Sequence, residues 1–504
     1  MKRMVAVIFA ASLLAGCATA PRHVARVPQS WATRIDALLA QPRFAHAEWG
    51  VSVMSLDSGR TLYAHNPDKL FVPASNAKLY TAALALDTFG PGRRFDTTLY
   101  RTDVPIADGT LNGNLILAGG GDPSLGRADT SPDWADRLAQ ALASRGVHRV
   151  RGDLVADATF LQAPPFGNGW EANDLQAWYA APASALNVQG NLAYVQVSRV
   201  AGHCCAVSIT PDEAGLRVVN LMHDDNGERD TLNLYRPPGS ESVYASGGLP
   251  ASASTRTLPV SVPDPARFAG NLLRDALLRQ GIALEGQVRA LYWPQPDNVA
   301  AGLVTIDSVN SPPLSDLVTH MLKTSDNLYA QTLLQEVGVR AAQTGTCLDR
   351  AEPPTTSDEW GLCALRAMLA RAGIADDSTT MEEGAGLSRK DLVTPAATTR
   401  LLAWIARQSF ASGFHDALPI AGVDGTLEHR FLGTPAADNL RAKTGTLTHA
   451  YALSGYVTDA AGEHLAFALM LDHYQRPSDS LGRNIAPSPN ADLDTVAAML
   501  TEIR

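Results

Sequence analysis

The sequence predicts a mixed α/β fold in which helices flank an antiparallel sheet and a large β-rich insertion interrupts the domain that carries the sheet. Alternating apolar and polar residues, typical of strands, occur near both ends of the chain, and helical periodicity clusters after residue 300. The tract between them consists of short strand patterns broken by Gly, Asn, Asp and Pro. The 504 residues, 45% hydrophobic and 18% charged, are sufficient for several domains and a large core.

The N-terminus resembles a secretory signal peptide. A basic start precedes an apolar run at residues 4–15, which is too short to remain as a membrane-spanning helix. Residues 14–17 read Leu-Ala-Gly-Cys and resemble a bacterial lipobox, in which Cys17 becomes the lipidated first residue of the mature chain. The alternative is cleavage after Ala20, which would leave Pro21 at a position that such cleavage disfavours.

This start predicts the location of the protein. We expect a signal peptide at residues 1–17, followed by a polar tether at residues 18–29. Ala18 after the lipobox cysteine is similar to sorting signals for the outer membrane of a Gram-negative cell. The expected product is a periplasmic protein that meets the membrane only through an N-terminal lipid anchor.

The mature chain opens with a helix, a hairpin and a second helix. Residues 31–39 have the pattern of an amphipathic helix, and alternating strands at 48–56 and 60–64 flank the turn sequence Asp57-Ser58-Gly59. Another helix is expected from Ser75. A strand pair followed by a helix is a typical opening of an α/β sandwich.

The middle tract predicts short strands at residues 110–118, 149–156, 194–199 and 216–221. Within it, only residues 134–145 have a strong helical pattern. We therefore expect residues 95–300 to form one or two accessory domains. They would be inserted into a catalytic domain made of residues 30–94 and 301–504.

The C-terminal third predicts helices first and strands afterwards. Helical patterns cover residues 315–338, 361–372 and 395–409, and strand patterns cover residues 441–443, 452–457 and 464–471. These last strands are expected to complete the sheet that the N-terminal hairpin begins.

Ser75 and Lys78 are the candidate catalytic pair. Three residues apart at a helix start, they lie on one helical face, where the lysine amine can reach the serine hydroxyl. A serine needs an adjacent base to act as a nucleophile, and a desolvated neutral lysine can be that base, whereas arginine effectively cannot lose its proton. Lysine is scarce in this chain, which has six lysines among its 41 basic residues.

Two further motifs follow in order along the chain. Ser325-Asp326-Asn327 lies inside the returning helical segment, and Lys443-Thr444-Gly445-Thr446 lies near the C-terminus. Ser-x-x-Lys, Ser-x-Asn and Lys-Thr-Gly in this order resemble the signature of penicillin-binding proteins and serine β-lactamases. The resemblance implies a transpeptidase-like fold, with an antiparallel sheet flanked by helices.

Longer stretches resemble one family more closely: the D-alanyl-D-alanine carboxypeptidases/endopeptidases of the class C low-molecular-mass penicillin-binding proteins, peptidase family S13. The similar stretches are residues 120–125, 152–155, 181–186, 311–317 and 321–330. The resemblance covers nearly the whole mature chain, including the insertion. It implies peptidoglycan stem peptides and cross-links as substrates, and covalent inhibition by β-lactams. One departure is visible at residues 383–388, Glu-Gly-Ala-Gly-Leu-Ser, where the family usually has Asp-Gly-Ser-Gly-Leu-Ser.

The physics of acyl transfer and the resemblance agree on the catalytic roles. Ser75 attacks the carbonyl carbon of the penultimate D-alanine while neutral Lys78 accepts its proton. Ser325 relays that proton to the leaving group, and Asn327 holds Lys78 and the substrate amide. Lys443 is expected to keep Lys78 neutral by like-charge repulsion and to attract the terminal carboxylate of the peptide.

The rest of the Lys-Thr-Gly strand is expected to bind substrate. Thr444 and Thr446, on either side of Gly445, can bind the peptide carboxylate. The backbone N–H groups of Ser75 and Thr446 are expected to form the oxyanion hole.

Four cysteines remain after Cys17, an even number in an oxidising compartment. Cys347 and Cys363 flank a polar loop and are a disulfide candidate. Cys204 and Cys205 are adjacent and cannot pair in ordinary geometry without strain, so their partners stay open. The spacing of histidines and cysteines predicts no metal site, and no cofactor is expected.

The composition also bears on partners. The net charge of −10 and a pI near 5.6, with no basic cluster beyond the N-terminus, argue against nucleic acid. Two rival functions remain: a β-lactamase, which shares the acylation chemistry, and a noncatalytic wall-binding lipoprotein that retains the fold. No Glu-x-x-x-Asn segment is placed as in class A β-lactamases, and the intact motifs argue against a noncatalytic scaffold.

Overall fold

The computed structural model describes residues 30–102, 104, 106–200, 203–224, 229–253, 255–295, 302–348 and 352–504. The predicted signal peptide, Cys17 and the tether at residues 18–29 lie outside these ranges. Among the helices that are described, none combines the length and the apolar character needed to cross a membrane.

A five-stranded antiparallel sheet joins the two ends of the chain. Its order is β2-β1-β22-β21-β20, so that the N-terminal hairpin lies at one edge and the last motif strand at the other. Glu48 in β1 pairs with Asp472 in β22, which fixes the register between segments from opposite ends of the sequence. The bounds are β1 Glu48–Ser55, β2 Thr61–His65, β20 Arg441–Leu447, β21 Ala450–Thr458 and β22 His464–Asp472.

Helices cover both faces of this sheet, which confirms the predicted fold class. Because side chains alternate across a strand, Phe467 and Leu469 of β22 join one apolar cluster while Ala468 and Met470 join the other. The first face is covered by α1 (Trp31–Leu39) and α10 (Pro489–Leu500). The second is covered by α2 Ala77–Phe89, α5 Leu314–Thr324, α6 Asn327–Thr344, α7 Ser357–Arg371, α8 Pro395–Ile405 and α9 Ala411–Ala417.

The helical segment predicted at residues 315–338 is two helices rather than one. Ser325 ends α5 in the left-handed conformation, with φ of 63°, and Asp326 begins α6 by accepting a hydrogen bond from the backbone N–H of Tyr329. An aspartate that caps the next helix supplies a local reason for the break. The Ser-x-Asn motif therefore forms the junction between two helices. Its serine belongs to the turn between them rather than to the face of either helix.

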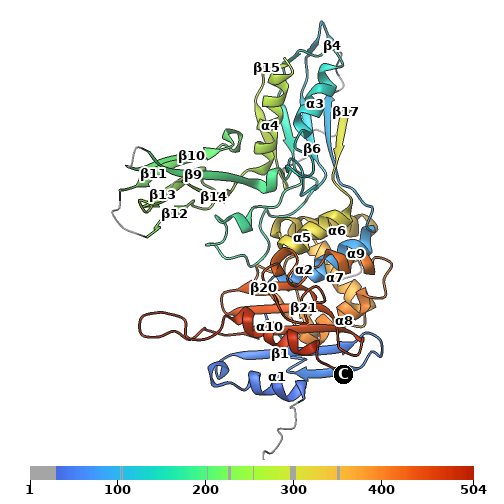
Figure 1. Ribbon diagram of the computed structural model, residues 1–504. Helices are drawn as coiled ribbons and strands as arrows, with labels where there is room; N and C mark the ends of the chain where they lie inside the picture. Colours follow the sequence, from blue (N-terminus) through green and yellow to red (C-terminus); the bar gives the residue numbers. More distant parts are fainter. Residues whose placement is uncertain are drawn as a thin grey trace, which may run out of the picture.

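The insertion rises from the helical layer as two lobes (Figure 1). One lobe holds a five-stranded sheet of order β16-β8-β6-β3-β17 and a smaller sheet of order β15-β7-β5-β4. The bounds are β3 Asp96–Thr102, β4 Ile106–Ala107, β5 Thr110–Leu111, β6 Leu115–Gly119, β7 Arg149–Val150, β8 Leu154–Asp157, β15 Ala283–Leu284, β16 Val288–Leu291 and β17 Leu303–Asn310.

The other lobe holds two three-stranded sheets, of order β10-β9-β14 and β11-β13-β12. Their bounds are β9 Leu192–Val200, β10 His203–Thr210, β11 Arg217–Met222, β12 Asn233–Tyr235, β13 Ser242–Gly247 and β14 Thr255–Ser261. A two-stranded sheet in the catalytic part consists of β18 (Thr379–Thr380) and β19 (Leu392–Val393).

Two details of the insertion differ from the sequence prediction. Strand β17 pairs with β3, so the accessory sheet runs to Asn310, beyond the boundary predicted at residue 300. This pairing joins the first strand of the insertion to a strand about 200 residues later in the chain, so it leaves no local signal in the sequence. A second helix, α4 (Pro265–Arg279), packs beside α3 (Trp134–Ala143) and was missed. Its start signals are present: Asp264 caps it and Pro265 occupies its first turn.

The four described cysteines form two disulfides. Cys347 is bonded to Cys363, the pair that the sequence singles out. Cys204 is bonded to Cys205, which the sequence argument disfavoured. The two Cα atoms lie 3.1 Å apart, and the peptide bond between the two residues is cis.

Candidate active site

Ser75 lies in the short 3₁₀ turn Ala74–Asn76 that leads directly into α2. Ala74, the residue before it, has a positive φ of 46°, an uncommon conformation for a residue with a side chain. Lys78 is in the first turn of α2, and its Nζ donates a hydrogen bond to Ser75 Oγ at 2.9 Å. The predicted pair is therefore in contact, with the half-buried serine on the open side and the lysine beneath it.

Lys78 is held in place by two further acceptors. Its Nζ also donates to Oδ1 of Asn327, at the start of α6, and to the carbonyl oxygen of Ala385 at 2.6 Å. The side chain is fully buried, and burial lowers its pKa to about 8, although the nearby carboxylates of Glu383 and Asp326 act in the opposite direction. With this pKa, a minor but appreciable fraction of Lys78 is neutral near physiological pH, and that neutral amine can take up a proton.

The third motif contacts the second in the same way. Lys443, on β20, is fully buried and donates from Nζ to Ser325 Oγ at 2.9 Å and to the Thr444 carbonyl oxygen at 2.8 Å. Burial, and then the charge of Lys78, lower the pKa of Lys443 well below its usual value. The sequence argument placed this repulsion on Lys78. It lowers the pKa of Lys443 instead, because the carboxylates beside Lys78 partly counter the effect of burial there and favour the charged form of Lys78.

Strand β20 approaches the nucleophile closely because it carries a glycine. A Cβ atom at Gly445 would lie 2.6 Å from the Pro73 carbonyl oxygen and 3.0 Å from Asn76 Nδ2. Asn76 Nδ2 also donates to the Lys443 carbonyl oxygen at 3.1 Å, which fastens the serine turn to the strand. Gly445 thus has a steric role that only a residue without a side chain can fill.

The two threonines of the strand have different surroundings. Thr444 is half-buried and donates from Oγ1 to Thr426 Oγ1 at 2.9 Å. Thr446 is exposed and lines a cavity of about 400 Å³ together with Ser75, Ser325 and Asn327. The predicted nucleophile, relay serine, amide and strand threonine therefore face one space, with both lysines in contact with its walls.

Several groups that complete the site were not predicted. The Tyr179 carbonyl oxygen accepts a hydrogen bond from Asn327 Nδ2 at 2.7 Å, and Tyr179 belongs to a 3₁₀ turn of the insertion, Trp178–Ala180. The Ala385 carbonyl oxygen receives Lys78. Backbone acceptors leave no side-chain signal in a sequence, so only the structure identifies them.

Glu383 explains how the altered 383–388 loop keeps its shape. The buried carboxylate accepts hydrogen bonds from the backbone N–H groups of Ala385 at 2.6 Å and Leu387 at 2.8 Å, as well as from Gly386 and Ser388. These bonds hold the Ala385 carbonyl toward Lys78. The two altered side chains, Glu383 and Ala385, therefore lie at the loop that contacts Lys78: the Glu383 carboxylate holds the loop and its charge favours protonated Lys78, while Ala385 contributes its backbone carbonyl.

Within the described part of the chain, no group of three or more His, Cys, Asp or Glu side chains is arranged to hold a metal ion. The site instead consists of a serine, two buried lysines and a second serine between a sheet edge and a helical layer. This fold and this site define the class of active-site serine penicillin-binding proteins.

Comparison with known proteins gives the family within that class. The chain belongs to the D-Ala-D-Ala carboxypeptidase 3 (S13) family, which it matches over residues 31–487. It is 32% identical to a D-alanyl-D-alanine carboxypeptidase of Actinomadura sp. (strain R39), over 93% of this chain and 84% of that protein. It is 27% identical to the D-alanyl-D-alanine carboxypeptidase DacB of Haemophilus influenzae, over 84% of this chain and 85% of that one.

A solved structure agrees with the fold. The crystal structure of penicillin binding protein 4 (dacB) from Haemophilus influenzae aligns with a TM-score of 0.79 and 25% sequence identity. The alignment covers 93% of this chain and 99% of that chain, so the insertion is part of the likeness.

Proposed function

We propose that this protein hydrolyses the D-alanyl-D-alanine bond of peptidoglycan stem peptides through an acyl-enzyme on Ser75. The observation that carries the proposal is the contact of Lys78 Nζ with Ser75 Oγ at 2.9 Å, beside the Lys443–Ser325 pair. Membership of the carboxypeptidase family supports the same substrate.

Acylation begins when Ser75 Oγ attacks the carbonyl carbon of the penultimate D-alanine. Neutral Lys78 takes the hydroxyl proton as the new C–O bond forms. Ser325 donates its hydroxyl proton to the departing amine and takes in exchange the proton that Lys78 accepted, and the C–N bond breaks to release D-alanine. A water molecule then attacks the ester carbon, the bond from that carbon to Ser75 Oγ breaks, and the same groups carry a proton of the water to Ser75 Oγ.

The peptide carboxylate is proposed to bind along β20. Lys443 donates a hydrogen bond to Ser325, which lines the cavity, and Thr446 lines the cavity itself. An arriving carboxylate favours the charged form of Lys443, whose pKa burial has lowered. Thr444 and the backbone at Gly445, on the same strand, are also proposed to bind the peptide carboxylate.

Replacing Lys443 with alanine tests this carboxylate site. We expect kcat/KM to fall about 10- to 100-fold on donors with a free terminal carboxylate, because a charge-assisted interaction is lost, and about 3-fold or less on the corresponding methyl esters. Lys69→Ala is the control, because its exposed ion pair with Glu48 contributes little. Equal losses on the two kinds of donor would contradict the role of Lys443.

The same site is proposed to react with β-lactams and to cut D-alanyl cross-links between stem peptides, since both present an acyl group to Ser75. Following the decay of a penicilloyl-enzyme separates this protein from a β-lactamase. Decay over minutes to hours, together with release of D-alanine from a stem peptide, supports a peptidase. Decay within milliseconds supports a lactamase, and no labelling at all supports the noncatalytic alternative.

We also propose that the mature protein is periplasmic and anchored to the outer membrane through a lipid on Cys17, after cleavage before that cysteine removes residues 1–16. The lipobox-like residues 14–17 and the expected cell-wall substrate support this placement. Labelling cells with a fatty-acid analogue should mark the wild-type protein and not Cys17→Ala. Equal labelling of both would contradict the proposal.

A further inference from the structure

A second hollow of about 380 Å³ lies beside the catalytic cavity. The two hollows share part of their walls, so the second space adjoins the one that Ser75 lines. The shared residues are Trp178, Tyr179, Thr324, Ser325 and Asn327. Ser325, the proposed proton relay to the leaving amine, therefore borders both spaces.

The far wall of the second hollow comes from the insertion. It includes Arg127, Leu192 and Tyr194, which have no place in the proposed acylation chemistry. Two aromatic side chains that line the hollow are exposed to solvent: Trp178 is 55% exposed and Tyr194 is 43% exposed. Exposed large aromatic residues around a hollow are typical of a surface that binds an extended ligand.

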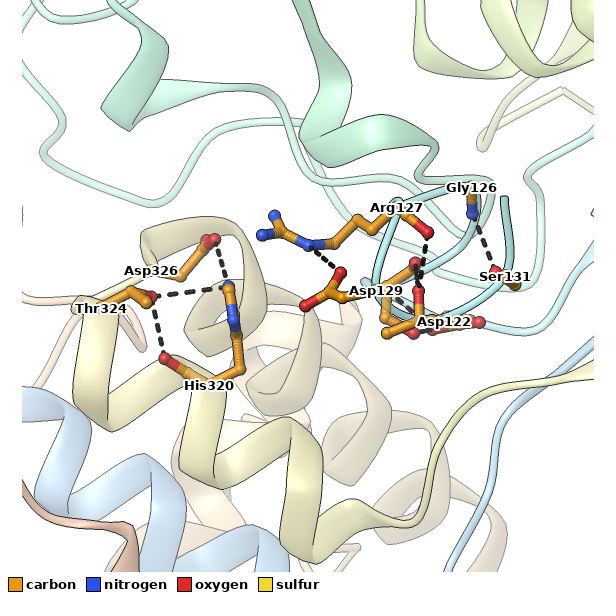
Figure 2. A network of polar contacts seen from close by, with 10 residues as sticks. Asp122, Gly126, Arg127, Asp129, Ser131, His320, Thr324 and Asp326 are labelled. Atoms are coloured by element: carbon orange, nitrogen blue, oxygen red, sulfur yellow. Dashed lines mark hydrogen bonds and ion pairs between the residues drawn. The ribbon is translucent and has the colours of Figure 1, made fainter. Parts of the chain in front are cut away.

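The Arg127 guanidinium is not fully hydrogen-bonded by the rest of the described chain. Figure 2 shows its side chain reaching from the insertion loop toward His320 and Asp326 on the helical layer. Its nearest carboxylate oxygen belongs to Asp129, 3.6 Å from Nε, which exceeds hydrogen-bonding distance. Within the part of the chain that the structure describes, the buried Nε has no hydrogen-bond partner.

The acids around Arg127 are themselves engaged or open to water. Asp326 is paired with His320 Nε2 at 3.3 Å and accepts from the Tyr329 backbone N–H; against the effect of burial, these partners and, less strongly, the charge of Arg127 lower its pKa. Asp129 is 66% exposed, so solvent screens its charge. The Arg127 guanidinium, which also lies 5.9 Å from the centre of the Tyr329 ring, remains available to an anionic group in the hollow.

The positions of the two proposed catalytic serines indicate which part of the substrate the second hollow holds. It lies on the leaving side, where the residue released after acylation would bind. The acyl group must lie on Ser75, which lines only the first of the two cavities, whereas Ser325 lines both. Resting on the function proposed above, we propose that the second hollow binds the side chain of the leaving residue of a cross-linked peptide and that Arg127 pairs with a carboxylate on it.

Two synthetic peptides that differ only in the leaving residue test this. Both carry the same N-acetylated lysyl-D-alanyl acyl group, followed by D-2-aminopimelate in one peptide and by D-norleucine in the other. We expect Arg127→Gln to lower kcat/KM about 10-fold on the aminopimelate peptide and 2-fold or less on the norleucine peptide, because only the former offers a side-chain carboxylate.

Three controls separate this role from structural damage. Arg137→Gln changes an exposed arginine of α3 and should behave as wild type on both peptides. Arg127→Lys keeps the positive charge and should retain more activity on the aminopimelate peptide than Arg127→Gln. Fluorescent penicillin labelling should be equal in all these proteins, since Ser75 and its partners are untouched.

Equal losses on the two peptides, or no loss, would overturn the role of Arg127. A wild-type protein that releases D-alanine from a stem peptide but cleaves neither test peptide would overturn the leaving-side assignment alone. A wild-type protein that neither releases D-alanine nor binds penicillin would instead overturn the proposed function itself.

Discussion

Replacing Ser75 with alanine is expected to lower kcat on the order of 10⁵- to 10⁶-fold and to abolish labelling by fluorescent penicillin. The loss is large because no acyl-enzyme can form without Ser75 Oγ. The fold should persist, since Ser75 is only half-buried and Lys78 keeps its bonds to Asn327 and Ala385. Release of D-alanine, penicillin labelling and the midpoint of urea unfolding are the measurements.

Ser409→Ala provides the matched control, because Ser409 is exposed at a distance from the motifs along the chain. The kcat of this control should differ from that of the wild type by about 2-fold or less. Retained D-alanine release by Ser75→Ala, with an unchanged unfolding midpoint, would place the nucleophile elsewhere.

The second large effect concerns Lys78. Lys78→Met should slow acylation about 10²- to 10⁴-fold, the usual contribution of a positioned general base. The wild-type acylation rate should rise as pH increases through about 8, because only the neutral amine accepts the serine proton and burial sets its pKa there. This rise should be absent from the variant. Stopped-flow acylation by a chromogenic β-lactam between pH 6 and pH 10 measures both effects.

Lys78→Arg separates base catalysis from a simple need for charge. Arginine keeps the cation but effectively cannot give a neutral base, so this variant should be as slow as Lys78→Met. Rapid acylation by Lys78→Arg would mean that a positive charge at this position is sufficient, and the role of Lys78 as a base would be wrong.

Local patterns account for most of what the sequence predicted. The helix at Trp31–Leu39 and the C-terminal strands follow from hydrophobic periodicity, which the buried faces of the sheet require. The three motifs could be placed in order because each is a short run of chemically constrained residues. Their meeting around one cavity required the resemblance to a family, since contacts between distant segments have no local signature.

The structure differs from the sequence predictions where contacts between distant parts of the chain determine the local conformation or the pKa. The predicted helix over the second motif is broken at Ser325, where a left-handed residue is followed by the capping residue Asp326. The pairing of β17 with β3 depends on a partner strand far away in the sequence. The depressed pKa of Lys443 depends on burial and on the charge of Lys78, neither of which the Lys-Thr-Gly pattern reveals.

The central claim is that Lys78, Ser325 and Lys443 act around the hydroxyl of Ser75. Mass spectrometry of the intact wild-type protein after reaction with benzylpenicillin, followed by peptide mapping, tests it most directly. The account predicts one penicilloyl group per chain, attached to the peptide that contains Ser75. An adduct on another peptide, or an unmodified folded protein, would contradict it.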